Sequence, residues 1–213
     1  MLSATPVVFV VDDDPSVREA LESLIVQAGW RAQVFESAQH FLSFPRASAP
    51  SCLVLDVSLP GLNGLELQSL IAGDRIDMPI IFITGHADVP MTVKAMKAGA
   101  VEFLTKPVAE DVLINAIGSA IARSRITLVQ ESESQALRSL YAKLTPRERD
   151  VMTLVVRGLL NKQVGGELGM AEITVKAHRG QVMRKMKATS FADLVNMALR
   201  LGLASASKRS HNK

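Results

Sequence analysis

The first half of the chain alternates short apolar runs with longer segments whose apolar residues recur at helical spacing. Short apolar runs bounded by turn residues are typical of strands that are buried on both faces of a parallel sheet. Five such strands are predicted, at residues 7–11, 31–35, 52–56, 79–83 and 100–104. A helical segment follows each strand. This alternation predicts an α/β fold with a doubly wound, five-stranded parallel sheet in the order 2-1-3-4-5.

Polar side chains follow the carboxyl ends of four of these strands. They are Asp12, Asp13, Asp56, Thr84 and Lys106. A lone aspartate at a strand end commonly forms a turn, so Asp56 by itself would predict only a cap for the next loop. Parallel strands, however, place all of their carboxyl ends on one rim of the sheet, where open α/β sheets bind ligands. We therefore expect these five side chains to form one site.

The three carboxylates of this predicted site require a counter-charge, because each raises the pKa of the others. A divalent cation, Mg²⁺ or Mn²⁺, could supply that charge and bind through carboxylates, water and phosphate oxygens. Lys106 and Thr84 could hold phosphoryl oxygens as charge develops during transfer. The pattern therefore predicts phosphorylation of Asp56.

The second half of the chain has a purely helical pattern. Thr145, Pro146 and Glu148 predict a helix start with a capping box, and this helix extends to about residue 157. Helices at 161–168 and 172–187 follow, and Ser190 begins a fourth. Two short helices joined by a glycine-containing turn, the second of them basic, indicate an all-α, four-helix helix-turn-helix domain.

A connecting segment at 110–142 joins the two halves. Helical spacing over 110–125 is followed by a more polar stretch, and an apolar face resumes at Leu137. We interpret this as a helix that extends into a semi-flexible helical linker, with fraying near Ser132 as an alternative to one continuous helix. The apolar heptads are too few to predict a coiled coil.

Charge divides the chain in the same way as the helical pattern. The 213 residues carry a net charge of +3, but residues 1–140 carry −6 and residues 141–213 carry +9. This asymmetry indicates a basic domain that binds a polyanion, joined to an acidic domain with another role. The single cysteine, Cys52, favours a reducing compartment. Because no signal peptide is evident and no apolar run approaches the length of a membrane span, we expect a cytoplasmic protein without a membrane partner.

Four motifs in residues 7–122, taken together, resemble the receiver domain of two-component response regulators. In chain order they are VVDDD, LVLDVSLPGLNG, IIFITGHADVPMTVKAMKAGA and EFLTKP. The resemblance implies a CheY-like, flavodoxin-like fold with Asp56 as the phosphoacceptor. It also implies that Asp13, Asp56 and the backbone carbonyl of Ser58 hold the metal. Asp12 would act through water.

The same resemblance implies how the receiver domain responds to phosphorylation. Thr84 would be the switch hydroxyl, Phe103 the switch aromatic residue, and Lys106 the lysine that senses phosphate. Pro107 would follow a cis peptide bond. His86 could ligate a metal, but no second histidine is placed to assist it, and we favour an exposed residue that tunes dephosphorylation.

Residues 143–202 resemble the LuxR-type DNA-binding domain of NarL/FixJ response regulators, and the FixJ subgroup in particular. The motifs are LTPRERDVMTLVVRGLLNKQ and LGMAEITVKAHRGQVMRKM. The resemblance implies that the helix over 172–187 is the recognition helix, with Lys176 as the main base reader. The residues that we expect to contact DNA are Thr174, Lys176, Ala177, His178, Arg179 and Arg184.

Three departures from the family pattern predict a marginal DNA-binding domain. Ala171 replaces a frequent serine cap, which costs about 1 kcal/mol. Gly180 lies within the recognition helix, where relatives can carry a longer side chain that contacts bases. Gly165 and Gly166 lie within the preceding helix, where each glycine costs about 1 kcal/mol relative to alanine.

These predictions give four regions: a receiver domain at 1–122, a helical linker at 123–142, a LuxR-type domain at 143–204, and a basic, disordered tail at 205–213. We expect a transcriptional regulator that a cognate sensor histidine kinase phosphorylates on Asp56. Phosphorylation would make the protein a homodimer on double-stranded promoter DNA. RNA polymerase could be a further partner. Whether the receiver domain also inhibits the DNA-binding domain stays open.

Two other classes of function fit parts of this pattern. Phosphatases with an aspartyl nucleophile also combine a strand-end aspartate with Mg²⁺, but they typically need a second aspartate at the position of Ser58, and they leave the basic half unexplained. A phosphorylation-independent DNA-binding protein would not need the complete acidic site. We therefore expect no enzyme beyond a phosphoacceptor that catalyses its own phosphoryl transfer and dephosphorylation.

Overall fold

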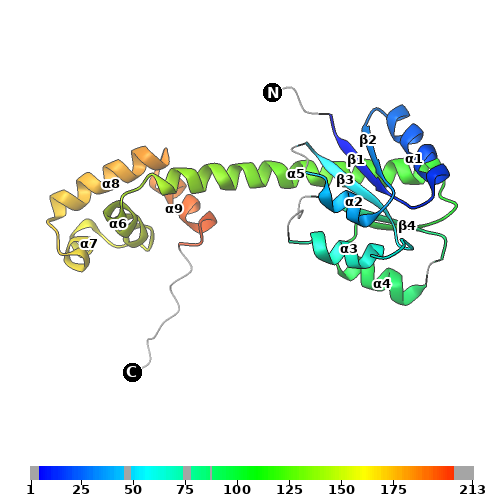
Figure 1. The fold of residues 1–213 in the computed structure, drawn as a ribbon. Helices are drawn as coiled ribbons and strands as arrows, with labels where there is room; N and C mark the ends of the chain where they lie inside the picture. Colours follow the sequence, from blue (N-terminus) through cyan, green and yellow to red (C-terminus); the bar gives the residue numbers. More distant parts are fainter. Residues whose placement is uncertain (1–4, 46–48, 74–77, 87, 204–213) are drawn as a thin grey trace. The chain divides into compact units, whose positions relative to one another are not determined.

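A computed structural model describes residues 5–45, 49–73, 78–86 and 88–203, which form two compact units, Met1–Val129 and Gln130–Lys213 (Figure 1). The predicted tail at 205–213 lies outside the described residues. The first unit contains β1 (Val7–Val11), α1 (Pro15–Gln27), β2 (Arg31–Phe35), α2 (Ala38–Ser43), β3 (Ser51–Asp56), α3 (Gly64–Ile71), β4 (Ile80–Thr84), α4 (Val89–Lys97), β5 (Glu102–Thr105) and the start of α5 (Glu110–Ala142). The second unit contains α6 (Pro146–Val156), α7 (Asn161–Leu168), α8 (Glu172–Met186) and α9 (Phe191–Arg200).

The strands of the first unit form the predicted parallel sheet, in the order β2-β1-β3-β4-β5. β5 begins at Glu102, two residues later than expected. The reason is that the Ala100 N–H donates to the carbonyl of Ala95, which keeps Ala100 at the end of α4. The doubly wound α/β fold is therefore confirmed, with boundaries of β3, β4 and β5 that differ from the prediction by one or two residues.

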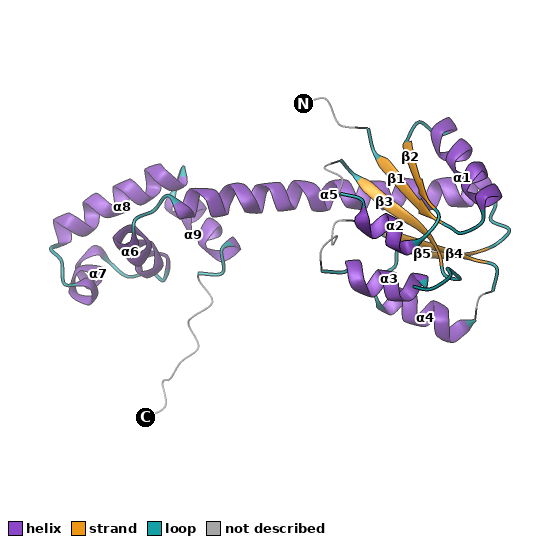
Figure 2. Ribbon diagram, in the orientation of Figure 1, coloured by secondary structure: helices purple, strands orange, loops and turns teal. Residues whose placement is uncertain are grey.

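Helices cover both faces of the sheet (Figure 2). On one face, Phe9, Leu53 and Phe82 pack in a core with residues of α2, α3 and α4. On the other face, Val10, Val54 and Ile81 pack in a second core with residues of α1 and α5. Alternate residues of β1, β3 and β4 thus serve opposite cores, which explains why these strands are apolar throughout.

The helix α5 is continuous from Glu110 to Ala142, without the fraying considered near Ser132. By length and composition it could cross a membrane, contrary to the expectation that no segment reaches that length. Its buried residues Leu113, Ile117 and Ile121 form part of the core against the sheet. Packing against the sheet thus explains the apolar residues of the first part of α5, which is a core helix, whereas Ile126 and Val129 further along are exposed.

The second unit has its own hydrophobic core, to which α6, α7, α8 and α9 all contribute. The predicted capping box starts α6: the Glu148 N–H donates to Thr145 Oγ1, and the Thr145 N–H donates to Glu148 Oε2. Ala171 provides no side-chain cap for α8, as expected. The expected penalty at Gly165 is wrong, because an added Cβ would lie 2.6 Å from the carbonyl oxygen of Met170, and only glycine allows this approach.

Candidate functional site

The register of the sheet brings the predicted polar residues to the same level. Val11 pairs with Leu55, so Asp12 and Asp56 are the next residues along β1 and β3. Thr84 pairs with Thr105, and Lys106 follows directly. The carboxyl ends of four neighbouring strands therefore deliver these side chains to one rim.

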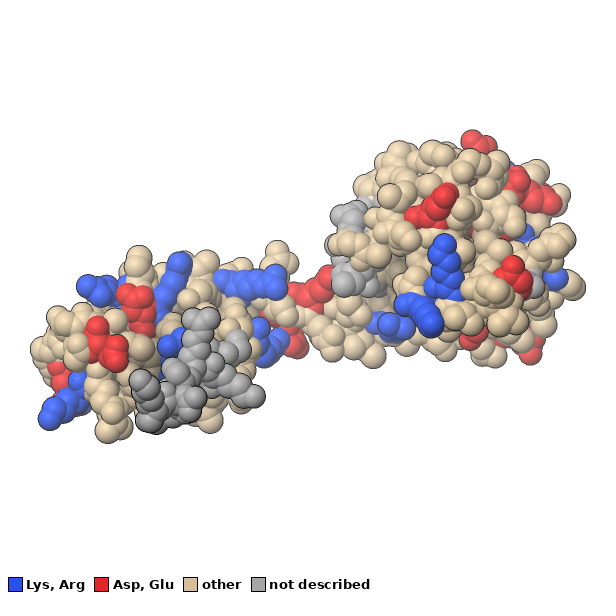
Figure 3. Space-filling model, turned by 90° about the horizontal axis from the view of Figure 1, so that it is seen from below, with Lys and Arg blue, Asp and Glu red and all other residues tan. Residues whose placement is uncertain are grey.

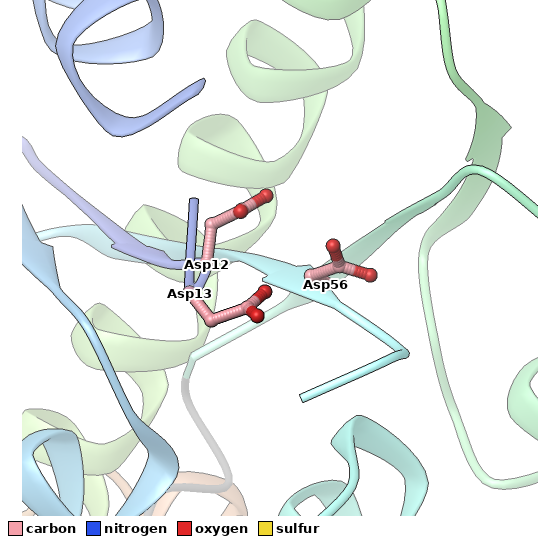
Figure 4. Close-up of side chains that lie close together, drawn as sticks. All are labelled: Asp12, Asp13 and Asp56. Carbon is pink, nitrogen blue, oxygen red and sulfur yellow. The ribbon is translucent and has the colours of Figure 1, made fainter. Parts of the chain in front are cut away.

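Three carboxylates gather beyond the ends of β1 and β3 (Figure 4). Asp12, Asp13 and Asp56 each offer an oxygen atom, and these atoms lie within 4.8 Å of one another. Asp12 is fully buried, Asp56 is buried, and Asp13 is exposed. Burial raises the pKa of Asp12, although hydrogen bonds from Lys106 and from the Asp14 N–H act in the opposite direction.

Lys106 bridges two of these carboxylates. Its Nζ lies 2.7 Å from Asp12 Oδ2 and 2.7 Å from Asp56 Oδ2. Desolvation acts to lower the pKa of Lys106, but the hydrogen bonds and charges of Asp12 and Asp56 outweigh it, so its pKa is raised. Lys106 therefore stays an ammonium ion and neutralises part of the charge at the rim. The Lys106–Pro107 peptide bond is cis, as expected.

The loop after β3 contacts the other oxygen of the Asp56 carboxylate, the one that Lys106 does not contact. The Ser58 N–H donates to Asp56 Oδ1 at 2.9 Å. Gly64 lies against the backbone of the same segment: an added Cβ would come within 2.6 Å of the Asp56 carbonyl oxygen. This role of Gly64 was not predicted from the sequence. The signal was a glycine at the very start of a helix, next to the Pro60–Asn63 turn.

Thr84 is buried at the end of β4 and has a partner in its own loop. Its hydroxyl donates to the carbonyl of His86 at 3.0 Å and accepts from the His86 N–H. The Phe103 ring packs 5.9 Å from that of Phe82. His86 is exposed and lies outside the three-carboxylate cluster. The switch roles of Thr84 and Phe103 stay predictions.

The residues at the rim fit a hard divalent cation. Carboxylate oxygens are the ligands that Mg²⁺ and similar ions prefer, and two or three of them usually suffice beside water and phosphate oxygens. The acidic cluster is therefore a pocket that could bind a divalent metal.

The second unit presents α8 as an exposed helix. Five of the six residues expected to contact DNA lie on or near the solvent-exposed surface of α8. Thr174, Lys176, Ala177 and Arg184 are exposed, and His178 is half-buried. On the face shown in Figure 3, Lys and Arg side chains of this unit lie interspersed with Asp and Glu, so charge alone does not mark one continuous patch.

Arg179 is half-buried and contacts two residues of the second unit. Its Nη1 donates to Asn161 Oδ1 at 3.3 Å, and its guanidinium lies 4.8 Å from the ring centroid of Phe191. The side chain thus joins the starts of α7 and α9 to α8, and a DNA contact by Arg179 stays a prediction.

Lys185 and Glu148 form an ion pair between α8 and α6, which the sequence analysis missed. Lys185 Nζ lies 2.7 Å from Glu148 Oε2. Burial acts to raise the pKa of Glu148, but hydrogen bonds from Lys185 and Thr145 prevail and lower it. No local signal in the sequence could reveal a contact between residues 37 positions apart.

Comparisons with known proteins match both units. The family model "Response regulator receiver domain" matches residues 8–118, and "Bacterial regulatory proteins, luxR family" matches residues 142–198. Nodulation protein W of Bradyrhizobium diazoefficiens is 50% identical over 202 residues, which cover 95% of this chain and 89% of that protein. The transcriptional regulatory protein FixJ of the same organism is 39% identical over 196 residues, or 92% and 96% of the two chains. This chain belongs to the NarL/FixJ family of response regulators.

Solved structures agree with this membership. The response regulator StyR has 46% sequence identity and a TM-score of 0.81, with 92% of this chain and 100% of that chain covered. Full-length FixJ from B. japonicum has 38% identity and a TM-score of 0.54, with 94% and 98% covered.

A response regulator that joins a receiver domain to a LuxR-type DNA-binding domain is a transcription regulator. The receiver domain implies a histidine kinase as a partner, and the LuxR-type domain implies binding to DNA. The predicted family is therefore confirmed. The roles of individual residues of this response regulator stay predictions.

Proposed function

We propose that a sensor histidine kinase phosphorylates this response regulator on Asp56, and that phosphorylation controls its binding to promoter DNA. The observation that carries the proposal is the position of Lys106, whose ammonium group contacts both Asp12 and Asp56 at 2.7 Å. A phosphoryl group on Asp56 adds negative charge beside Lys106. This lysine can therefore report the change to the rest of the rim.

The metal at this site would be Mg²⁺ or Mn²⁺. Asp13, Asp56 and the Ser58 carbonyl would hold it, with Asp12 acting through water. When bound, it would neutralise charge on the transferring phosphoryl group. The cluster of three carboxylates supports this assignment.

In the transfer step, a carboxylate oxygen of Asp56 forms a bond to phosphorus while the bond from phosphorus to the imidazole nitrogen of the kinase breaks. The Thr84 hydroxyl then leaves the His86 backbone and donates to a phosphoryl oxygen. Phe103 repacks against Phe82 as this loop moves. Hydrolysis of the phosphoryl group would reset the site, as in a phosphoacceptor that catalyses its own dephosphorylation.

Phosphorylation would favour a homodimer through the surface at 89–120. Val89, Val93, Met96 and Val112 are large apolar side chains that this surface leaves exposed, which supports the proposal. Tethering two DNA-binding domains makes the second contact with DNA intramolecular, which can raise avidity by roughly 10²–10⁴. Dimerisation thus suffices to couple the receiver to DNA.

The regions of the chain follow from this assignment. The receiver would occupy residues 1–122, the linker 123–142 and the DNA-binding domain 143–204, in the cytoplasm. Lys176 would be the main base reader of α8, and contact with RNA polymerase would follow DNA binding. The exposure of Lys176 supports the first of these roles.

Intact-mass spectrometry tests the chemistry directly. With Mg²⁺ and a small phosphodonor, we expect the wild-type chain to gain one phosphoryl group and Asp56→Asn to gain none. Asp13→Ala should slow the reaction and raise the Mg²⁺ concentration that it needs, because one carboxylate ligand is lost. Full modification of Asp56→Asn would show that the phosphoacceptor is another residue.

A further inference from the structure

One face of α8 is exposed along its length and has an apolar centre. Residues spaced four and seven positions apart lie on the same face of a helix. The exposed residues at this spacing are Ile173, Ala177, Gly180 and Arg184. The buried residues of the opposite face are Val175, Val182 and Met186. The side chains of Ile173, Ala177 and Gly180 have no hydrogen-bonding group. Hydrogen bonds to DNA from this part of α8 would therefore come from Arg184 and from residues beside this face, such as Lys176.

Ile173 is the most exposed large apolar residue of this face. Its side chain is 72% exposed and lies outside the hydrophobic core formed by the described residues of the second unit. Isoleucine is also stiff and only moderately favourable in a helix. Internal packing therefore does not explain an isoleucine in the first turn of α8.

Gly180 also lacks an explanation within the domain. It has no left-handed backbone conformation, and an added Cβ would meet no described atom within 4 Å. Glycine is unfavourable within a helix. A partner that approaches the helix closely from outside would explain it, since glycine marks sites of close backbone approach.

Binding to DNA would explain both the exposed Ile173 and the glycine at position 180. The recognition helix of a helix-turn-helix domain lies in the major groove, and its N-terminal residues contact base edges. The thymine 5-methyl group is the apolar feature of that groove. Ile173 and Gly180 are seven residues apart, which corresponds to about 10 Å along a helix, or about three base pairs at 3.4 Å each.

We infer that Ile173 is a specificity-determining residue that recognises a thymine through its 5-methyl group, while Gly180 lets α8 lie close to the floor of the groove. The inference deepens the DNA-binding function and rests on it. Ile173 selects an A·T pair at its position because its side chain gains nothing from the hydrogen-bonding edges of a G·C pair. Lys176 reads a neighbouring position through its charge.

Replacing thymine by deoxyuridine tests this inference without altering the protein. The full-length chain, with Mg²⁺ and a phosphodonor, first selects its preferred duplex from a random pool. Each thymine of that duplex is then replaced singly, and Kd is measured by fluorescence anisotropy. We expect one thymine in each half-site at which loss of the methyl group weakens binding about fourfold, as for burial of one methyl-sized group.

Protein variants identify the reader of that methyl group. Ile173→Ala should bind the thymine duplex about as weakly as the wild-type chain binds the deoxyuridine duplex, and should no longer distinguish the two. Ile173→Val should keep most of the discrimination. Leu160→Ala removes an equally exposed apolar residue (70%) outside α8 and should keep all of it.

Two results would overturn the inference about Ile173 and leave the proposed DNA-binding function intact. In one, the wild-type chain prefers its selected duplex, but no thymine is sensitive to replacement by deoxyuridine. In the other, Ile173→Ala keeps the full ratio between the thymine and deoxyuridine duplexes. If the selection enriches no sequence at all, the proposed function and this inference fail together.

Discussion

Lys106 links the two buried carboxylates of the receiver rim, and its positive charge offsets the repulsion between them. One ammonium group lies at hydrogen-bonding distance from Asp12 and Asp56, while Asp13 stays exposed at the edge. Removing the lysine would leave Asp12 beside the charge of Asp56 without a positive partner, and the Asp56 charge acts to raise the pKa of Asp12. Lys106 and the Ser58 N–H therefore together orient the Asp56 carboxylate.

A substitution at Gly180 should change the stability of the second unit and its affinity for DNA in opposite directions. We expect Gly180→Ala to raise the stability of the second unit by about 1 kcal/mol, because alanine favours a helix and the space at this position is open. The same methyl group should weaken binding to all duplexes by about 1–3 kcal/mol, as overpacking of a close contact does. Thermal unfolding and anisotropy titrations measure the two effects.

Gly166 provides the matched control for this prediction. It also lies within a helix, and an added Cβ would meet no described atom within 4 Å. Gly166→Ala should stabilise the unit by a similar amount and leave DNA affinity unchanged. If Gly180→Ala also binds DNA with unchanged affinity, α8 does not approach the groove at this residue.

Among the helices, α8 is fixed to α6 by the Glu148–Lys185 ion pair and to α7 and α9 by Arg179. Two basic residues of α8, Arg179 and Lys185, therefore hold it against its neighbouring helices. Glu148 is buried, and its carboxylate also accepts the Thr145 N–H that caps α6. This carboxylate thus stabilises both the start of α6 and the position of α8.

This ion pair predicts a pH-dependent stability of the second unit. Because the pKa of Glu148 is lowered in the folded protein, its contribution to stability is complete above the unfolded pKa of about 4.3 and is lost as the pH falls through the folded pKa. We expect Glu148→Gln to destabilise the unit by about 1–2 kcal/mol at pH 7. This difference in unfolding free energy should shrink below pH 4.

Hydrogen exchange of α6 and α8 in the full-length chain, measured at pH 7 and again below pH 4, tests this prediction. Arg147→Gln is the control, because the ion pair of Arg147 with Asp150, at 3.8 Å, is exposed, and such pairs contribute little. A loss of protection in Glu148→Gln that stays the same at low pH would show that the carboxylate charge is not responsible.

The limits of sequence-based prediction follow from the range of each interaction. The helix starts at Asp14, Thr145 and Ser190 depend on residues within four positions, so their sequences predicted them. The rim residues were predictable because parallel strands share one carboxyl edge. The roles of Gly64 and Gly165 depend on how the chain turns: an added Cβ would lie 2.6 Å from the carbonyl oxygen of Asp56 or of Met170, and local sequence does not reveal this close approach.

At the scale of the whole molecule, two units with separate cores share one chain. The acidic unit contains the three-carboxylate cluster proposed as the phosphoacceptor site, and the basic unit contains α8, the proposed recognition helix. We propose that the effect of phosphorylation on DNA binding acts through an equilibrium of the whole protein. A dimer of the receiver supplies such an equilibrium, because it joins two weak DNA contacts.

The affinity of the full-length chain for its selected duplex, with and without a phosphodonor, tests this account most directly. In the presence of Mg²⁺, the account predicts that phosphorylation tightens binding of the wild-type chain by roughly 10²–10⁴, with dimers in sedimentation at the concentrations that saturate the duplex. Asp56→Asn should show neither effect. The account is contradicted if phosphorylated wild-type protein binds as weakly as the unmodified chain, or if Asp56→Asn responds to the phosphodonor as the wild-type chain does.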